Sequence, residues 1–217
     1  MKILILGATG RTGRLIVEEA LKHGYDLNVL VRDKNKIPFT AKIKVYHGTP
    51  ARRTDLAAAM QGCDLIVSAL NITRASDLPW SKPITPKNFI TESMQNVIAE
   101  AGQQKLERLI TISAWGVGET KQEVPFWFRW LINYTNLRFN YAEHESQEKL
   151  LAGSNLKWTA VRPVALNDSN KVKTLKVSFN NSPKPSLQIS RQSVAKFIVD
   201  IVKSDKYDRK SPTISEN

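Results

Sequence analysis

Six short apolar runs are spaced along the 217-residue chain, and helical patterns of apolar and polar positions lie between them. Short apolar runs bounded by turn residues are typical of buried strands, whereas apolar positions three and four apart indicate helices. The predicted strands are residues 2–6, 27–31, 42–46, 64–70, 108–112 and 156–161. The predicted helices are one from Arg14 to a cap at Gly24, and 55–60, 86–102, 139–151 and 189–202. This alternation predicts an α/β fold, a doubly wound and mainly parallel Rossmann-like sheet in the order 3-2-1-4-5-6.

A glycine-rich turn separates the first strand from the first helix. It consists of Gly7, Ala8, Thr9, Gly10, Arg11, Thr12 and Gly13. Three glycines suit a tight exit from the strand, a close approach of the backbone to a pyrophosphate, and close packing of helix on strand. Free amides at the helix N-terminus would hold the phosphates. The strand before the turn, the helix after it and the second strand favour a dinucleotide-binding site over a turn without a ligand.

The second strand ends in Arg32 and Asp33, where this fold meets the adenosine ribose. An acidic residue there accepts from the 2'-hydroxyl of NAD, whereas an arginine suits the 2'-phosphate of NADP. Because Arg32 comes first, we expect NADP(H), with NAD(H) as the alternative if Asp33 points at the ribose.

Small residues follow two other strands at the same edge of the predicted sheet. Ala69 and Leu70 end the fourth strand, where a Rossmann chain passes beside the cofactor. Ser113 and Ala114 follow the fifth strand and face the switch-point crevice. The irregular stretch 71–86 is expected to border the same cleft, because loops of that length inside a compact domain are commonly functional.

The composition of the chain limits which classes of ligand and partner we expect it to bind. The chain has 32 basic and 20 acidic residues, and the excess lies in residues 1–60 and 151–217, which are expected to flank the cleft. Such a basic rim favours phosphorylated or carboxylated ligands. No nucleic-acid motif, metal-ligand cluster, signal peptide or apolar run of about 18 residues is visible. We therefore expect a cytoplasmic protein without metal, nucleic-acid or membrane partners, in which Cys63 is a small buried residue.

Residues 125–134 are the most aromatic part of the chain, since half of them are Phe, Trp or Tyr. That much apolar surface is not expected to lie entirely in water. Three destinations stay open: a core helix, a wall or lid of the substrate pocket, or a contact with a second subunit, a protein partner or a membrane surface.

The rest of the chain is predicted to form one domain over residues 1–217. Residues 164–190, with a weak alternation from Lys171, would add a small substrate-side lobe, and residues 204–217 have the composition of a polar tail. A polar loop that contains Pro38 is predicted over 33–40.

Four motifs, in this order over nearly the whole chain, resemble one family. They are the turn 7–13, Val31-Arg32-Asp33, Ser113-Ala114 and Val161-Arg162-Pro163. They are similar to those of the atypical short-chain dehydrogenase/reductases with NAD(P)-binding folds, in particular the NmrA-like and biliverdin/flavin reductase branch. The resemblance implies the fold and the cofactor, and it places Ser113 and Pro163 beside the nicotinamide.

The resemblance also implies a catalytic role for Ser113, because the wider family uses a serine after strand five together with a Tyr-x-x-x-Lys pair. Here the positions of that pair fall on Asn140 and His144, and Tyr141 is one residue out of register, about 100° round a helix. His144 coincides with a histidine of the biliverdin/flavin reductase branch and is the best candidate for a proton donor. The alternative for His144 is a helix histidine bonded to Glu148.

The sequence departs from the family at two further positions, with Thr49 in place of an acidic residue and Val164 in place of a histidine. The substrate of a family member therefore cannot be assigned to this chain from the resemblance. We expect an NADPH-dependent reductase of a small or planar acceptor such as a flavin, a quinone or a carbonyl compound. Solvent can supply the proton when hydride goes directly to a flavin or quinone, so loss of the tyrosine is tolerable. The alternative is a non-catalytic NADP(H)-sensing regulator that binds a protein partner through residues 125–134.

Overall fold

The apolar run at the start of the chain becomes β1 (Lys2–Leu6), a strand in the interior of a mostly parallel sheet. The computed structural model describes residues 1–37, 41–170 and 173–217. The main sheet has the order β3-β2-β1-β4-β5-β6-β10-β8, with β8 antiparallel to β10 and the other pairs parallel. Its other strands are β2 (Asp26–Val31), β3 (Ile43–His47), β4 (Leu65–Ser68), β5 (Arg108–Ile112), β6 (Lys157–Pro163), β8 (Leu175–Ser178) and β10 (Thr213–Glu216).

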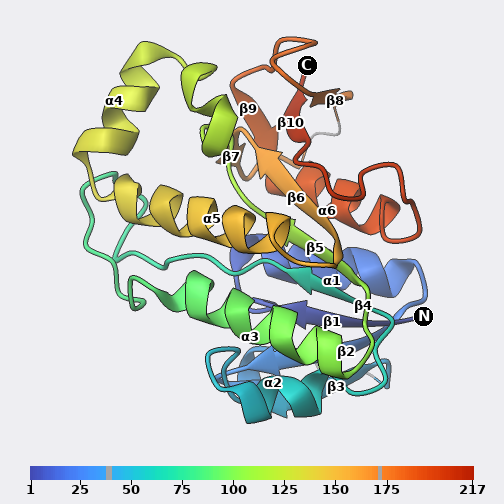
Figure 1. Cartoon of the computed structure of the whole chain (residues 1–217). Coiled ribbons are helices and arrows are strands. Elements are labelled where there is room, and N and C mark those ends of the chain that lie inside the picture. The colour runs from blue at the N-terminus through green and yellow to red at the C-terminus, as the bar shows by residue number, and fades with distance from the viewer. Residues whose placement is uncertain (38–40, 171–172) are drawn as a thin grey trace.

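Helices cover both faces of this sheet (Figure 1). Those on one face are α1 (Arg11–Lys22) and α6 (Arg191–Asp200), and those on the other are α2 (Arg53–Met60), α3 (Phe89–Gln103) and α5 (Leu137–Ala152). The remaining elements are α4 (Phe126–Tyr134), the 3₁₀ turns η1 (Lys34–Lys36) and η2 (Gly118–Gln122), and the strand pair β7 (Ala165–Asn167) with β9 (Gln188–Ser190). In Figure 1, α4 stands out from the corner of the molecule beside α5.

Side chains alternate along β1 and pack into two separate hydrophobic cores, one on each face of the sheet. Ile3 and Ile5 pack with the core under α1 and α6, whereas Leu4 and Leu6 pack with the core under α2 and α3. A parallel strand covered on both faces carries apolar residues at every position, and this explains the continuous run in the sequence. The six predicted strands are confirmed in the predicted order, and β10 and β8 extend the sheet beyond them.

The prediction of a polar tail over 204–217 is wrong, because Thr213–Glu216 forms the buried strand β10. Its polar side chains are satisfied inside the protein. Glu216 Oε1 accepts a hydrogen bond from Ser190 Oγ at 2.8 Å, and Ser215 Oγ accepts one from the Ser186 amide at 3.1 Å. Buried polar groups are tolerated in a protein interior when they have hydrogen-bond partners. The polar composition of this strand therefore led to the wrong prediction of an exposed tail.

Two smaller predictions are also corrected. The first helix begins at Arg11 and not at Arg14, with Gly10 as its N-cap. Cys63 is only partly buried; it accepts from Asn28 Nδ2 at 3.3 Å, and burial raises the pKa of its thiol to about 11. In the region 164–190, β8 joins the main sheet through β10, whereas β7 and β9 pair separately.

Parts of two predicted segments lie outside the described residues. They are residues 38–40 of the polar loop, which include Pro38, and residues 171–172 at the start of the weak alternation. Among the described residues, none of the helices is both long and apolar enough to cross a bilayer. The same residues contain no cluster of His, Cys, Asp and Glu fit to hold a metal ion.

Candidate functional site

A cavity of about 980 Å³ lies at the carboxyl ends of β1, β2, β4 and β5, where helices and loops leave the parallel strands. Every site residue proposed from the sequence lines it: Gly7, Thr9, Gly10, Arg11, Thr12, Gly13, Arg32, Ala69, Leu70, Ser113, Ala114, His144 and Pro163. The stretch 71–77 lines it too, as expected for a loop that borders the cleft. The fold thus brings all these residues to one cleft, and their individual roles stay predictions.

The glycine turn is packed too closely for side chains at two of its glycines. Gly7 has φ +80°, and a Cβ there would lie 2.6 Å from the Ala69 carbonyl oxygen. A Cβ on Gly13 would lie 2.0 Å from the Gly7 carbonyl oxygen, so α1 approaches the turn as only glycine allows. The Arg14 amide donates to Gly10 O at 2.9 Å, which leaves the amides of residues 11–13 without partners inside the helix. This cradle of free amides at a helix N-terminus fits a pyrophosphate.

The two residues at the end of β2 that could contact the ribose, Arg32 and Asp33, differ in position and in hydrogen bonding. Arg32 is exposed and lines the cleft. Asp33 instead caps η1, where its Oδ1 accepts from the Asn35 amide at 3.1 Å, and its Oδ2 lies 3.8 Å from Lys36 Nζ. Asp33 is therefore engaged in its own turn, and the side chain presented to the cleft is the arginine.

Arg11 connects the glycine turn to two loops at the mouth of the cleft. Its guanidinium lies 2.7 Å from Asp77 Oδ1 and 3.5 Å from Asp168 Oδ2. Asp168 also pairs with Arg191 at 2.7 Å, at the start of α6. The sequence pattern singled out Arg11 but not its partners, because they lie 66 or more residues away.

The hydroxyl of Ser113 is held by α5. Ser113 Oγ donates to Glu148 Oε1 at 2.5 Å. Asn140, which stands at the position of the family's tyrosine, donates to Asn71 Oδ1 at 2.9 Å and to the Ile72 carbonyl at 3.0 Å. Asn140 thus ties α5 to the loop after β4, a structural task and not an acid–base one.

His144 is almost fully buried, and its Nδ1 has no hydrogen-bond partner among the residues that the structure describes. The alternative is a histidine bonded to a neighbouring carboxylate such as Glu148; among the described residues Glu148 accepts hydrogen bonds from Ser113 and Arg162, and none from His144 is found. Burial lowers the pKa of His144 to about 4, so the imidazole is neutral at pH 7. Tyr141 also lines the cleft; its hydroxyl donates to the Trp115 carbonyl at 3.3 Å, and burial raises its pKa.

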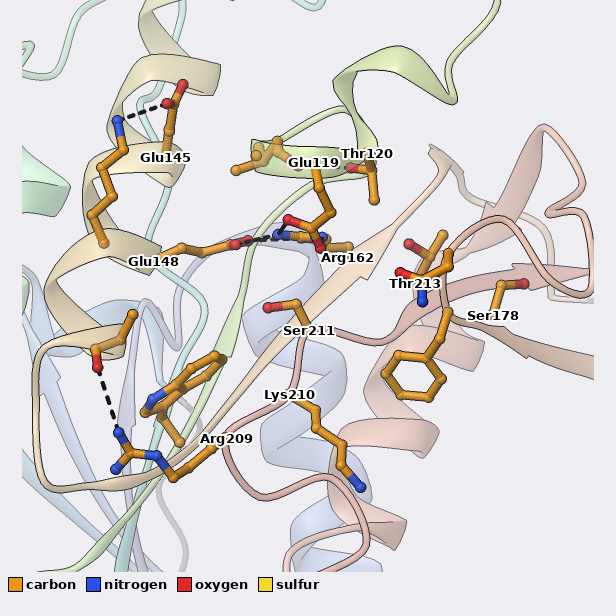
Figure 2. A pocket seen from close by; sticks show the side chains of 17 residues that line it. Glu119, Thr120, Glu145, Glu148, Arg162, Ser178, Arg209, Lys210, Ser211 and Thr213 are labelled. Atoms are coloured by element: carbon orange, nitrogen blue, oxygen red, sulfur yellow. Dashed lines mark hydrogen bonds and ion pairs between the residues drawn. The ribbon is translucent and has the colours of Figure 1, made fainter.

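Behind Ser113 lies a cluster of charges around the buried guanidinium of Arg162, which the sequence pattern did not indicate. Figure 2 shows Glu119 and Glu148 directed at the guanidinium of Arg162, each lying 2.5 Å from it. Burial lowers the pKa of Arg162, but the hydrogen bonds that it donates to Glu148 and Glu119 outweigh this effect and raise the pKa overall. The hydrogen bond from Arg162 lowers the pKa of Glu119. A second cavity of about 420 Å³ opens beside this cluster, on the side of Arg209 and Ser211.

Parts of the aromatic segment 125–134 lie in the hydrophobic core and in the wall of the cleft, two of the three locations considered from the sequence. Ile132 is buried, and Phe128 lines the cleft and packs edge-on against Tyr141 with centroids 6.4 Å apart. Phe126 and Trp130 point to the surface. Trp115, Phe89 and Tyr141 line the cleft together with Phe128.

Comparison with known proteins settles the family. A sequence profile of the NAD(P)H-binding family matches residues 7–205, from the first glycine of the turn to the residues beyond α6. The chain belongs to the NAD(P)H-binding family. The predicted resemblance to NAD(P)-binding Rossmann proteins is thereby confirmed.

The curated relatives differ in how much of their length the chain matches. Reductase pytE of Aspergillus terreus is 23% identical over 91% of this chain and 90% of its own length. The photosystem II assembly factor Ycf39 of Synechocystis is 25% identical over 97% of this chain, and that of Cyanophora paradoxa is 30% identical over 52%. The chain spans 61% of the Synechocystis protein and 34% of the Cyanophora protein.

Several solved structures share the fold. The oxidoreductase ylbE of Lactococcus lactis superposes with a TM-score of 0.82 at 18% identity, covering 100% of this chain and 91% of that one. A short-chain dehydrogenase/reductase of Veillonella parvula in complex with NADP gives 0.82 at 18%, covering 99% and 94%. The anaerobillin reductase ChuY of Escherichia coli O157:H7 gives 0.81 at 18%, covering 100% and 97%.

Proposed function

We propose that this NAD(P)H-binding protein is an NADPH-dependent reductase of a small planar acceptor. The observation that carries the proposal is a single cleft with two chemically different ends. One end holds the amide cradle of residues 11–13 and the exposed cation Arg32, which suit a phosphorylated dinucleotide. The other end is walled by Trp115, Phe128 and Pro163, which offer flat apolar surfaces to an aromatic acceptor.

The side chains that could donate a proton in the cleft limit which class of acceptor the protein can reduce. His144 is neutral at pH 7, Tyr141 has a raised pKa, and the Ser113 hydroxyl proton is directed at Glu148. None of these three is set up to give a proton to a substrate. Reduced nicotinamide, when bound, supplies hydride, and a flavin or quinone can take its proton from water. We therefore favour a flavin or quinone over an aldehyde or ketone, which needs an acid at its oxygen.

The roles of the chain's own residues follow from this arrangement. The turn 7–13 binds the pyrophosphate and Arg32 the 2'-phosphate. Ser113, Ala114 and Pro163 bound the nicotinamide, with the Ser113 hydroxyl fixed by Glu148. Trp115 and Phe128 exclude water from the acceptor. The names of pytE and ChuY, both reductases, support this class of reaction.

The test is NADPH oxidation by the purified protein, followed at the nicotinamide absorbance, with flavins, quinones and aldehydes as acceptors. We expect turnover with a flavin or quinone that exceeds turnover with any aldehyde, and that falls in an Arg32→Ala variant at limiting NADPH. Turnover confined to aldehydes would contradict the acceptor class. NADPH binding without turnover on any acceptor would contradict the reductase itself.

A second candidate function has one specific observation in its favour. Phe126, Trp127 and Trp130 are exposed on α4 rather than enclosed in the cleft. A cofactor-sensing protein that binds a partner through this surface would account for them and for the missing Tyr-x-x-x-Lys pair. The same assay separates the two, because the sensor binds NADPH and reduces nothing.

A further inference from the structure

Six large apolar side chains form one exposed face at the corner of the molecule. They are Trp80, Ile84, Phe126, Trp127, Trp130 and Tyr134, each between 51% and 75% exposed, and we call them the aromatic face. The two segments that carry them are joined, since Asn136 Nδ2 donates to the Trp80 carbonyl at 2.6 Å. In Figure 1 the helix α4 that bears four of them projects away from the sheet. Apolar side chains gathered on one face mark an interaction surface.

The helix that presents this face is anchored on its other side. Ile132 is buried in the core, and Phe128 packs against Tyr141. The Thr135 hydroxyl donates to the Leu131 carbonyl at 2.7 Å, which closes the end of α4. The outward side chains are therefore held in place by a packed helix, and their exposure does not come from an unfolded segment.

The charges around the aromatic face have a single sign. Residues 78–91 and 124–142 together contain Lys82, Lys87, Arg129 and Arg138 and no Asp or Glu. Lys87 Nζ and the Arg138 guanidinium lie 4.3 Å and 5.0 Å from the centroid of the Phe139 ring, so cations of the two segments converge. Across the described parts of the chain, none of these four cations forms an ion pair with a carboxylate.

Two of the carboxylates that flank these segments in the sequence do not offset this charge. Asp77 is paired with Arg11 at the mouth of the cleft. Glu143 is buried and accepts hydrogen bonds from the Ile90 and Thr91 amides at 2.8 Å and 3.0 Å. The other two flanking carboxylates, Glu92 and Glu123, form no ion pair in the described parts of the chain, so the four cations exceed the unpaired carboxylates near the aromatic face by two.

We propose that the aromatic face binds the surface of an anionic lipid bilayer. Trp and Tyr are the residues that settle at the boundary between headgroups and acyl chains, and Lys and Arg beside them attract anionic lipids. A second copy of this chain is a poorer occupant, because a symmetric dimer would bring the same four cations against each other. A protein partner would have to be acidic and hollowed to receive a convex helix. The expectation of no membrane partner rested on the lack of a spanning segment and does not bear on a surface contact.

The aromatic face lies beside the cleft, so membrane binding there would affect access of the acceptor to the cleft. Phe128 on α4 and Leu137 on α5 line the cleft, and residues 74–77 of the loop that carries Trp80 line its mouth. A bilayer bound to the aromatic face would thus lie next to the entrance for the acceptor. Membrane binding does not depend on the proposed reductase activity, so each can fail without the other.

The chain carries its own probe for this contact. Of its five tryptophans, Trp80, Trp127 and Trp130 lie on the aromatic face, whereas Trp115 and Trp158 are buried. The experiment is co-sedimentation and tryptophan emission of the full chain with vesicles of phosphatidylcholine alone, and with vesicles of phosphatidylcholine and phosphatidylglycerol in equal parts. We expect binding and a blue shift with the anionic vesicles, and a loss of both as salt is added.

Variants separate the two parts of the contact. A double variant Trp127→Ser with Trp130→Ser should lose at least tenfold in partitioning to the anionic vesicles. Each of Lys87→Gln and Arg138→Gln should lower it about fivefold at low salt. The matched controls are Leu187→Ser, which removes an exposed apolar side chain elsewhere, and Lys196→Gln on α6, and these should change nothing.

Three results would overturn the proposal. The first is equal sedimentation with both kinds of vesicle, or with neither. The second is binding to anionic vesicles that the controls weaken as much as the aromatic variants do, which would mean attraction by net charge alone. The third is a dimer by light scattering that the double tryptophan variant dissociates while vesicles bind nothing, which would assign the aromatic face to a second copy.

Discussion

Glu148 on α5 lies 2.5 Å from the buried guanidinium of Arg162 on β6 and accepts the Ser113 hydroxyl with its other oxygen. One carboxylate thus links a strand, a helix and the end of β5. Removal of one partner of a buried pair leaves the other charge uncompensated, at a cost of about 3–5 kcal/mol. Because Glu119 still compensates Arg162 in part, we expect Glu148→Gln to lower the free energy of unfolding by less than that, about 1.5–3 kcal/mol, measured by denaturant titration.

Glu119, the second partner of Arg162, provides the matched control. Its side chain is 65% exposed, so Glu119→Gln should cost only about 1 kcal/mol or less. Equal losses for the two variants would show that burial does not decide the strength of these pairs.

The close contact between Gly13 and Gly7 makes a second test. Gly13→Ala places a Cβ 2.0 Å from the Gly7 carbonyl oxygen, so α1 must shift away from the turn. We expect a loss of about 1–3 kcal/mol in stability and a loss of NADPH binding in a fluorescence titration. Gly102→Ala is the control, because it lies in α3 with open space around it and should stabilise by about 0.5–1 kcal/mol. NADPH binding to Gly13→Ala with unchanged affinity would rule out this turn as the pyrophosphate site.

Arg32 should determine the choice between the two dinucleotides. Arg32→Ala removes the cation that lines the cleft at the end of β2, so NADPH binding should weaken by about 1–3 kcal/mol and NADH binding much less. Lys34→Ala removes a neighbouring exposed charge from η1 and should leave the preference unchanged. The measurement is a binding titration of both dinucleotides. Equal losses for NADPH and NADH in Arg32→Ala would contradict the assignment of the 2'-phosphate.

His144 should make stability depend on pH in the acid range. The unfolded chain protonates this histidine below about pH 6.5, whereas burial lowers the pKa in the folded protein to about 4. The unfolded state therefore binds more protons between these values, and stability falls as the pH falls. This group alone should remove about 2 kcal/mol between about pH 7.5 and about pH 5.

A His144→Leu variant isolates that contribution. Its free energy of unfolding, compared with that of the unchanged chain by denaturant titration at both pH values, should fall by about 2 kcal/mol less. Parallel pH profiles of the two proteins would mean that the pKa of His144 in the folded protein equals its value in the unfolded chain, and His144 would then regain its place as a candidate proton donor.

The parts of the fold that sequence reasoning recovered are those set by local pattern. The strand 2–6 and the turn 7–13 follow from apolar residues and glycines that are neighbours in the chain. The start of α1 was missed by three residues, because Gly13 looks like part of the turn although it lies inside the helix. The aromatic segment was recognised, but whether Trp130 faces solvent or core depends on which side of α4 meets Tyr141.

The parts that were missed depend on contacts between distant segments. Arg162 pairs with Glu148 and Glu119, which lie 14 and 43 residues away, and no spacing rule joins them. Glu216 lies in a buried strand because Ser190 meets its carboxylate across 26 residues. Polar residues that find partners only in the folded chain look like surface residues in the sequence.

The place of β10 in the sheet also bears on how the protein is made. β10 completes the pairing of β6 and supplies the neighbour of β8, yet it is formed by residues 213–216. While the ribosome is still translating the segment before residue 213, both strands present unpaired edges, and such edges invite pairing with other chains. A variant that lacks residues 213–216 would therefore leave β6 as an open edge strand, an edge that β10 covers in the folded protein.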